Sequence, residues 1–215
     1  EILRIFQQID LATEIEQQIL PFTQMQLAKS PELPLINISL ENLKKPLGFP
    51  SDYWFYQPQI EKILRQGLAR FPNVEVRLGW EAQRIIQKDN TVFLKIKNLA
   101  KSQMETVQAS FLIGADGANS WLRRQIKTPL NSLNFEQKWL VIDTKLRANA
   151  TDSKWGNIHQ QICNPKQPIT YVPGVGQHRR WEIMLQNGSN TPTEQEARDI
   201  LDLGKHYNIH RIAEY

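Results

Sequence analysis

The sequence predicts an α+β fold, with an α/β part that contains a β-meander followed by a mainly antiparallel sheet. Three observations lead to this prediction. Apolar residues recur at helical spacing over residues 1–20 and 58–71. Short alternating segments then lead into a compact apolar run at 111–114. After Pro129, further strand-like segments follow one another with a single capped helix.

The N-terminal segment combines helical and extended patterns. Apolar spacing over residues 1–20 predicts two helices, or one bent helix, with a break near Asp10. Residues 21–56 are rich in proline and mixed in character, so no regular element is assigned to them. A proline in the first turn and one apolar face predict a helix over 58–71. Apolar and polar residues alternate over 74–78, which predicts a strand.

The next part of the chain is predicted to be a three-stranded antiparallel meander. Its strands are expected at 82–88, 91–97 and 104–109. The run at 111–114 is short, apolar and followed by glycine, which predicts a buried strand. A helix, a meander and a return to a buried strand together indicate an α+β insertion on an α/β sheet.

The second half of the chain predicts a separate sheet. The expected strands are at 139–146, 158–163, 169–172 and 179–185. Thr191-Pro192-Thr193-Glu194 has the spacing of a capping box, which predicts a helix that runs to about Leu203. We therefore divide the chain into residues 1–129 and residues 130–215, with the boundary near 129–134.

Composition narrows the classes of function. The 215 residues carry a net charge of +4, and 40% of them are hydrophobic, as in ordinary globular proteins. Basic residues are scattered, which allows an anionic ligand and argues against nucleic-acid binding. The single cysteine, Cys163, excludes an internal disulfide and favours a reducing cytoplasm. No apolar stretch approaches about 18 residues, so we expect neither a membrane span nor a secretory signal, and no residue spacing suggests a metal.

The segment from Phe111 to Arg124 carries the strongest candidate site. Glycines flank Asp116, and they allow a sharp turn beside a ligand at the carboxyl end of the predicted strand. Ser120 can cap the following helix, whose N–H groups would form an anion site. Arg123 and Arg124 could pair with phosphates. The alternative is an Asp-Gly turn with a local hydrogen bond, followed by a solvated helix face.

The spacing Asp-Gly-x-x-Ser-x-x-Arg resembles the second FAD/NAD(P)H motif of FAD-dependent aromatic-ring monooxygenases. The resemblance is nearest to 3-(3-hydroxyphenyl)propionate hydroxylases and phenol hydroxylases. Further segments resemble the same family and occur in its order. They are residues 1–11, the Gln-Pro-x-x-Glu-x-x-Leu-Arg helix at 57–65, residues 135–143, and the strand at 180–185.

Two motifs of that family are absent from the sequence. The Gly-x-Gly-x-x-Gly loop, which holds the FAD pyrophosphate in the family, has no counterpart here, since Gly174-Val175-Gly176 lacks the third glycine. The later Gly-Asp segment is missing too. We therefore interpret residues 1–129 as a partial FAD-binding domain and residues 130–215 as a truncated substrate sheet. Such a central fragment is expected to be inactive alone, and an exposed sheet edge would favour homodimers or aggregation.

The resemblance implies an activity for the whole protein. FAD would be reduced by NADPH or NADH, and the reduced flavin would react with O2 to give a C4a-hydroperoxide that hydroxylates a small phenolic compound. The implied cofactor contacts are Asp116, Gly117, Gln57, Arg123 and Arg4.

Candidate substrate contacts lie in the predicted second sheet. They are His159, Gln161 and Tyr171, each of which could equally be an ordinary sheet residue. No nucleophile motif is present, and no catalytic residue is assigned. Two alternatives stay open: another FAD-dependent tailoring oxidase or halogenase of the same fold, and an inactive fragment that acts as a binding or interaction module.

Overall fold

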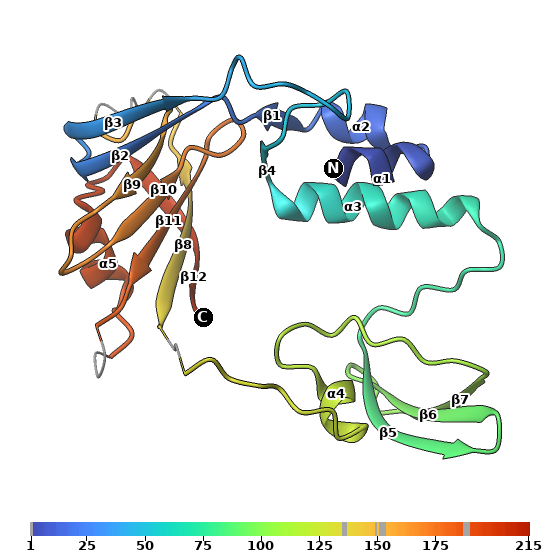
Figure 1. Ribbon diagram of the computed structural model, residues 1–215. Coiled ribbons are helices and arrows are strands. Elements are labelled where there is room, and N and C mark those ends of the chain that lie inside the picture. Colours follow the sequence, from blue (N-terminus) through green and yellow to red (C-terminus); the bar gives the residue numbers. More distant parts are fainter. Residues whose placement is uncertain (1, 135–136, 149, 151–153, 187–189) are drawn as a thin grey trace. The chain divides into compact units, whose positions relative to one another are not determined.

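The computed structural model describes residues 2–134, 137–148, 150, 154–186 and 190–215 (Figure 1). The chain forms two compact units. The first unit contains the residues up to Arg70 and those from 136 onward, and the second unit contains residues 71–135. The predicted division at residue 129 separates a cofactor part from a substrate part, and it stays a prediction. Glu1 and residues 135–136, which belong to segments that carry the family resemblance, lie outside the described residues.

A seven-stranded sheet dominates the first unit (Figure 1). In spatial order its strands are β12 (Tyr207–Glu214), β8 (Trp139–Leu146), β11 (His178–Met184), β10 (Ile169–Val172), β9 (His159–Ile162), β2 (Gln24–Ser30) and β3 (Leu33–Ser39). Neighbouring strands are antiparallel except for β2 and β9, which pair in parallel. All four strands predicted after residue 130 are present, which confirms the mainly antiparallel sheet and the α+β class.

Three strands of this sheet, β2, β3 and β12, were not predicted from the sequence. Strands β2 and β3 lie in the segment 21–56, to which no element was assigned. Strand β3 contains Pro34, which cannot donate a ladder hydrogen bond, and the β2–β3 pairing is irregular around Ala28. Strand β3 is an edge strand, where proline is tolerated. Strand β12 shifts register between Ile209 and Arg211, so its side chains do not alternate regularly in the sequence.

One face of the sheet is covered by helix α5 (Glu194–Leu201) and forms the main core. The inward side chains alternate along the strands, as in Leu140 and Ile142 of β8 and Trp181 and Ile183 of β11, all of which are fully buried. The helix begins two residues later than predicted. Its capping box joins Thr193 and Glu196, and Thr193 has the extended backbone of an N-cap residue.

Three helices and a two-stranded ribbon form the other part of the first unit. Helices α1 (Ile2–Gln8), α2 (Ala12–Glu16) and α3 (Gln57–Gly67) share a small apolar core, and a 3-10 turn (Leu68–Arg70) extends α3. The predicted break near Asp10 is confirmed, since this residue has a φ of +53° between α1 and α2. Strands β1 (Ile19–Pro21) and β4 (Tyr53–Phe55) pair beside the helices.

The second unit confirms the predicted meander. Its strands are β5 (Trp80–Lys88), β6 (Thr91–Asn98) and β7 (Met104–Ala109), followed by helix α4 (Trp121–Gln125).

Two strand predictions in this unit are wrong. Residues 74–78 and 111–114 form no strand, and Leu78, Phe111 and Ile113 are 66%, 86% and 89% exposed. Each segment has strand-like residues, but no strand of the described chain supplies its backbone hydrogen bonds. The expected parallel sheet of an α/β part is therefore not formed by the described residues.

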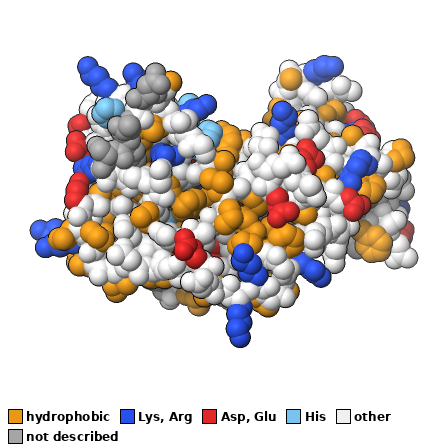
Figure 2. All heavy atoms as spheres, turned by 90° about the horizontal axis from the view of Figure 1, so that it is seen from above, with side chains coloured by type: hydrophobic (Ala, Val, Ile, Leu, Met, Phe, Trp, Pro, Cys, Tyr) orange, Lys and Arg blue, Asp and Glu red, His pale blue; other side chains and the backbone are white. Residues whose placement is uncertain are grey.

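The surface agrees with the charge pattern of the sequence. Lys and Arg side chains are scattered among acidic ones over the face drawn in Figure 2, with no continuous basic stripe there. Among the described residues, no helix has the length and apolar character needed to cross a bilayer.

Candidate functional site

The Asp-Gly loop of the second unit is held together by the carboxylate of Asp116. One carboxylate oxygen accepts a hydrogen bond from Ser120 Oγ at 2.5 Å, and the other accepts from the Leu122 N–H at 3.0 Å. Gly117 adopts a φ of +77°, which an L side chain rarely adopts. At Gly114 a Cβ would lie 2.5 Å from a terminal methyl group of Leu122, so a larger residue there would require the Leu122 side chain to shift.

Ser120 caps α4 as predicted, and its Oγ accepts the Arg123 N–H at 3.0 Å. The cap also corrects one expectation. The N–H groups of Leu122 and Arg123 are engaged by Asp116 and Ser120, so they are not available as an anion site. The guanidinium groups of Arg123 and Arg124 donate to the carbonyls of Ala118 and Asn119. In this arrangement both arginines stabilise the backbone of the loop through hydrogen bonds.

The hydrogen bonds to Asp116 predict a measurable shift. The Ser120 hydroxyl first, and then the Leu122 N–H, hold the pKa of the Asp116 carboxyl below its ordinary value. Because the folded pKa is depressed, the stabilisation by this group is present above the unfolded pKa and is lost as pH falls through the folded pKa. We expect Ser120→Ala to raise the pKa of Asp116 toward its ordinary value in an NMR titration.

A matched serine variant controls this experiment. Ser132 Oγ accepts the Asn134 N–H within the same unit and makes no hydrogen bond to the Asp-Gly loop. Ser132→Ala should leave the pKa of Asp116 unchanged. An unchanged pKa in Ser120→Ala would contradict the assignment of Ser120 as the main cause of the shift.

Gln57 and Arg4, the other predicted cofactor contacts, lie in the first unit. Gln57 is the first residue of α3, is exposed, and donates to Glu61 Oε1 at 2.7 Å. Arg4 is exposed on α1. Both side chains are accessible to a ligand, and their roles stay predictions, as do those of Asp116, Gly117 and Arg123.

The predicted substrate contacts fall on two different faces of the seven-stranded sheet. His159 and Gln161 alternate with buried residues of β9 and lie on the face opposite the main core, which we call the open face. Burial lowers the pKa of His159, whose ring packs edge-on against Phe22. Tyr171 is fully buried in the core, where its hydroxyl donates to the Gly156 carbonyl at 2.7 Å. The structure therefore gives Tyr171 a packing role.

The open face also carries charged residues that the sequence analysis did not single out. Arg180 of β11 lies directly opposite Asp143 of β8, and the two side chains form a bidentate ion pair. The signal in the sequence is the alternation of polar residues with core residues in β11 and in the second half of β8. It becomes informative only when the pairing register is known.

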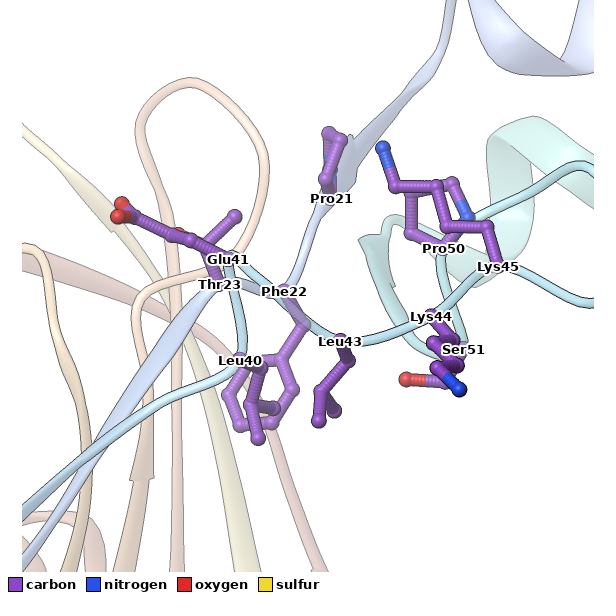
Figure 3. A pocket seen from close by; sticks show the side chains of 10 residues that line it. All are labelled: Pro21, Phe22, Thr23, Leu40, Glu41, Leu43, Lys44, Lys45, Pro50 and Ser51. Atoms are coloured by element: carbon purple, nitrogen blue, oxygen red, sulfur yellow. The ribbon is translucent and has the colours of Figure 1, made fainter.

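A cavity of about 230 Å³ lies elsewhere in the first unit. Its walls come from the connection between β1 and β2 and from the loop after β3, and Phe22, Leu40 and Leu43 form an apolar side (Figure 3). None of the predicted site residues lines it. Among the described residues, no group of three or more His, Cys, Asp or Glu side chains could hold a metal ion.

The fold is that of flavin-dependent monooxygenases. The flavin-dependent monooxygenase PieE, solved with FAD and substrate, aligns with a TM-score of 0.81 at 13% identity, over 99% of this chain and 41% of that one. The p-nitrophenol 4-monooxygenase PnpA from Pseudomonas putida DLL-E4 aligns with a TM-score of 0.81 at 14% identity, over 99% of this chain and 55% of that one. The model of the FAD binding domain family matches residues 1–210, and the chain belongs to this family.

Curated relatives agree with this assignment. A 3-(3-hydroxy-phenyl)propionate/3-hydroxycinnamic acid hydroxylase of Shigella sonnei is 28% identical over 207 residues, which are 95% of this chain and 35% of the relative. A probable NADH-specific resorcinol 4-hydroxylase of Rhodococcus jostii is 27% identical over 194 residues, which are 88% of this chain and 35% of the relative. The chain thus spans about a third of the length of these relatives, and the predicted resemblance is confirmed.

Proposed function

We propose that this chain is part of an FAD-dependent, NAD(P)H-using monooxygenase that hydroxylates a small phenolic compound with O2. The observation that carries the proposal is the Asp116–Ser120–Arg123 loop, formed within a chain that matches the FAD binding domain family over residues 1–210. The two curated relatives, both named as hydroxylases of phenolic compounds, support the same reaction class. A cytoplasmic location is part of the proposal.

The residues present fit part of an FAD site. Gly117 has no heavy atom within 4 Å of the place where a Cβ would lie, so a ligand can approach the backbone there. Asp116 can accept hydrogen bonds from ribose hydroxyls, the Gln57 amide can both donate and accept, and Arg123 and Arg4 can pair with phosphate. FAD supplies the redox chemistry when it is bound. These residues would bind and orient it, and the open face of the sheet would position the phenol.

The proposal is tested with the full-length protein. We expect it to take up FAD, to oxidise NADH or NADPH faster when a phenol is added, and to insert one oxygen atom from ¹⁸O2 into the product. Arg123→Met should raise the FAD dissociation constant at least about fivefold, since a charge-assisted hydrogen bond is lost. Arg84→Met, at an exposed position of β5, is the matched control and should leave it unchanged.

The 215 residues alone should bind FAD weakly or not at all, because their sequence contains no Gly-x-Gly-x-x-Gly loop for the pyrophosphate. Tight stoichiometric binding in an absorbance titration of the isolated chain would contradict this expectation. Failure of the full-length protein to bind flavin, or NAD(P)H oxidation that no phenol stimulates, would overturn the proposed function.

A further inference from the structure

A compact group of four charges lies on the open face of the seven-stranded sheet. Arg180 Nε donates to Asp143 Oδ1 at 2.7 Å, and its Nη2 donates to Asp143 Oδ2 at 3.2 Å. Arg211 of β12 lies opposite Asp143 on the other side, with Nη1 3.5 Å from Oδ2. Glu182 stands two residues beyond Arg180 on β11, 3.9 Å from its Nη1. Two arginines and two carboxylates give this quartet no net charge.

The quartet is accessible and is fixed by the sheet. Along β11, His178, Arg180 and Glu182 alternate with buried core residues, so all three lie on the open face. The side chains of Arg180 and Glu182 are each 36% exposed. In the next row, Thr170 donates to the Gln161 side chain at 2.7 Å, which adds two neutral polar groups beside Glu182.

The same face lies beside a predicted cofactor contact. The ring of His178 stacks on Tyr56, with centroids 3.9 Å apart and an interplanar angle of 14°. Tyr56 is the N-cap residue of α3 and directly precedes Gln57. A substrate held near Gln57 therefore lies close to the open face of the sheet, and both belong to the first unit.

We propose that the quartet selects an uncharged phenolic ring over a ring that carries a carboxylate. This inference rests on the proposed function, and it names the substrate class. The bidentate pair with Asp143 already occupies the fork of Arg180, so the guanidinium is a poor receptor for a second carboxylate. An additional negative charge would also meet Glu182, and like charges in contact oppose binding. A neutral phenol can donate its O–H to Glu182 and accept from Arg180 Nη1.

A cation outside the quartet lies on the same face and could attract a carboxylated substrate. Lys145 of β8 is exposed and lies opposite His178, one row beyond the quartet. It makes no ion pair within 4.0 Å among the described residues. A carboxylated substrate that reached Lys145 would avoid the quartet, so the test includes this position.

The test uses the full-length protein loaded with FAD and measures the change in flavin absorbance when a phenol binds. The probes are resorcinol, which is neutral, and 3-(3-hydroxyphenyl)propionate, which carries a carboxylate. We expect resorcinol to bind at least about tenfold more tightly, and Glu182→Gln to reduce this ratio at least about fivefold by removing the repulsion. Asp199→Asn, on the exposed side of α5, is the matched control and should leave the ratio unchanged.

The outcomes separate the inference from the function. Tighter binding of the carboxylated phenol, lost in Lys145→Met, would overturn the inference while the proposed function stands. A ratio that Glu182→Gln does not change would also overturn it. If FAD is bound but neither phenol perturbs its absorbance or stimulates NAD(P)H oxidation, the proposed function fails, and the inference fails with it.

Discussion

Replacement of Trp181 by alanine should lower the free energy of unfolding of the first unit by about 3–5 kcal/mol. The side chain is 0% exposed at the centre of the main core. Its ring lies 5.7 Å from Trp155, 5.1 Å from Tyr171 and 5.2 Å from Tyr207, measured between centroids. Alanine would leave a large cavity and remove three aromatic contacts, because the surrounding strands cannot collapse into the space. Urea unfolding followed by circular dichroism measures the loss.

An exposed aromatic residue of the same unit is the control. Phe55 in β4 is 55% exposed, so Phe55→Ala should change the free energy of unfolding by less than about 1 kcal/mol. Trp181→Phe should lie between the two variants, since it keeps one ring of the cluster. If Trp181→Ala cost no more than Phe55→Ala, the aromatic cluster would not be the main source of stability of this core.

The antiparallel sheet could be predicted because its strands carry their own signal. In β11 and in the second half of β8, inward-facing residues alternate with polar ones, and this period of two can be seen in the sequence without knowledge of the partner strands. The break at Asp10 and the cap at Ser120 could also be predicted, because each depends on residues that are only a few positions apart in the sequence. The edge strand β3 was not predicted, because it contains Pro34 and lies in a proline-rich segment that is typical of loops.

The two wrong strands show the limit of that reasoning. Residues 74–78 and 111–114 have the composition of strands, but a strand exists only where another backbone supplies hydrogen bonds. A local pattern reports how well a segment would fit a sheet, and it does not report whether the partner is present. The Asp-Gly loop, by contrast, closes on itself through Asp116 and Ser120, so it forms without a partner strand.

The charged groups of the open face could be found only with the fold in hand. Arg180 and Asp143 are 37 residues apart in sequence, and their contact depends on the register between β11 and β8. Neighbouring arginines in the sequence also have opposite surroundings. Arg180 lies half-buried on the open face, whereas Arg179 is only 7% exposed on the core side. They differ because successive side chains of a strand point to opposite faces of the sheet.

Arg179 is the second position where a single change should have a large effect. Its Nη1 lies 2.7–2.9 Å from the carbonyl oxygens of Pro173, Gly176 and His178, and its Nη2 donates to Asn157 Oδ1 at 3.0 Å. One buried guanidinium thus satisfies several carbonyls of the turn between β10 and β11. We expect Arg179→Met to lower the free energy of unfolding by about 2–4 kcal/mol, because methionine fills similar space but leaves buried acceptors without a donor.

The matched control is Arg65→Met on the exposed side of α3, which should change stability by no more than about 0.5 kcal/mol. Arg179→Lys separates charge from geometry, since lysine keeps the charge and loses the planar fork. If the planar fork is what stabilises the turn, Arg179→Lys should recover less than half of the loss in the free energy of unfolding.

The turn also sets the start of β11, where His178 stacks on Tyr56. Arg179→Met should therefore weaken phenol binding in the FAD-loaded full-length protein. If the variant unfolds more easily but binds phenol with unchanged affinity, the turn stabilises the fold without positioning the phenol.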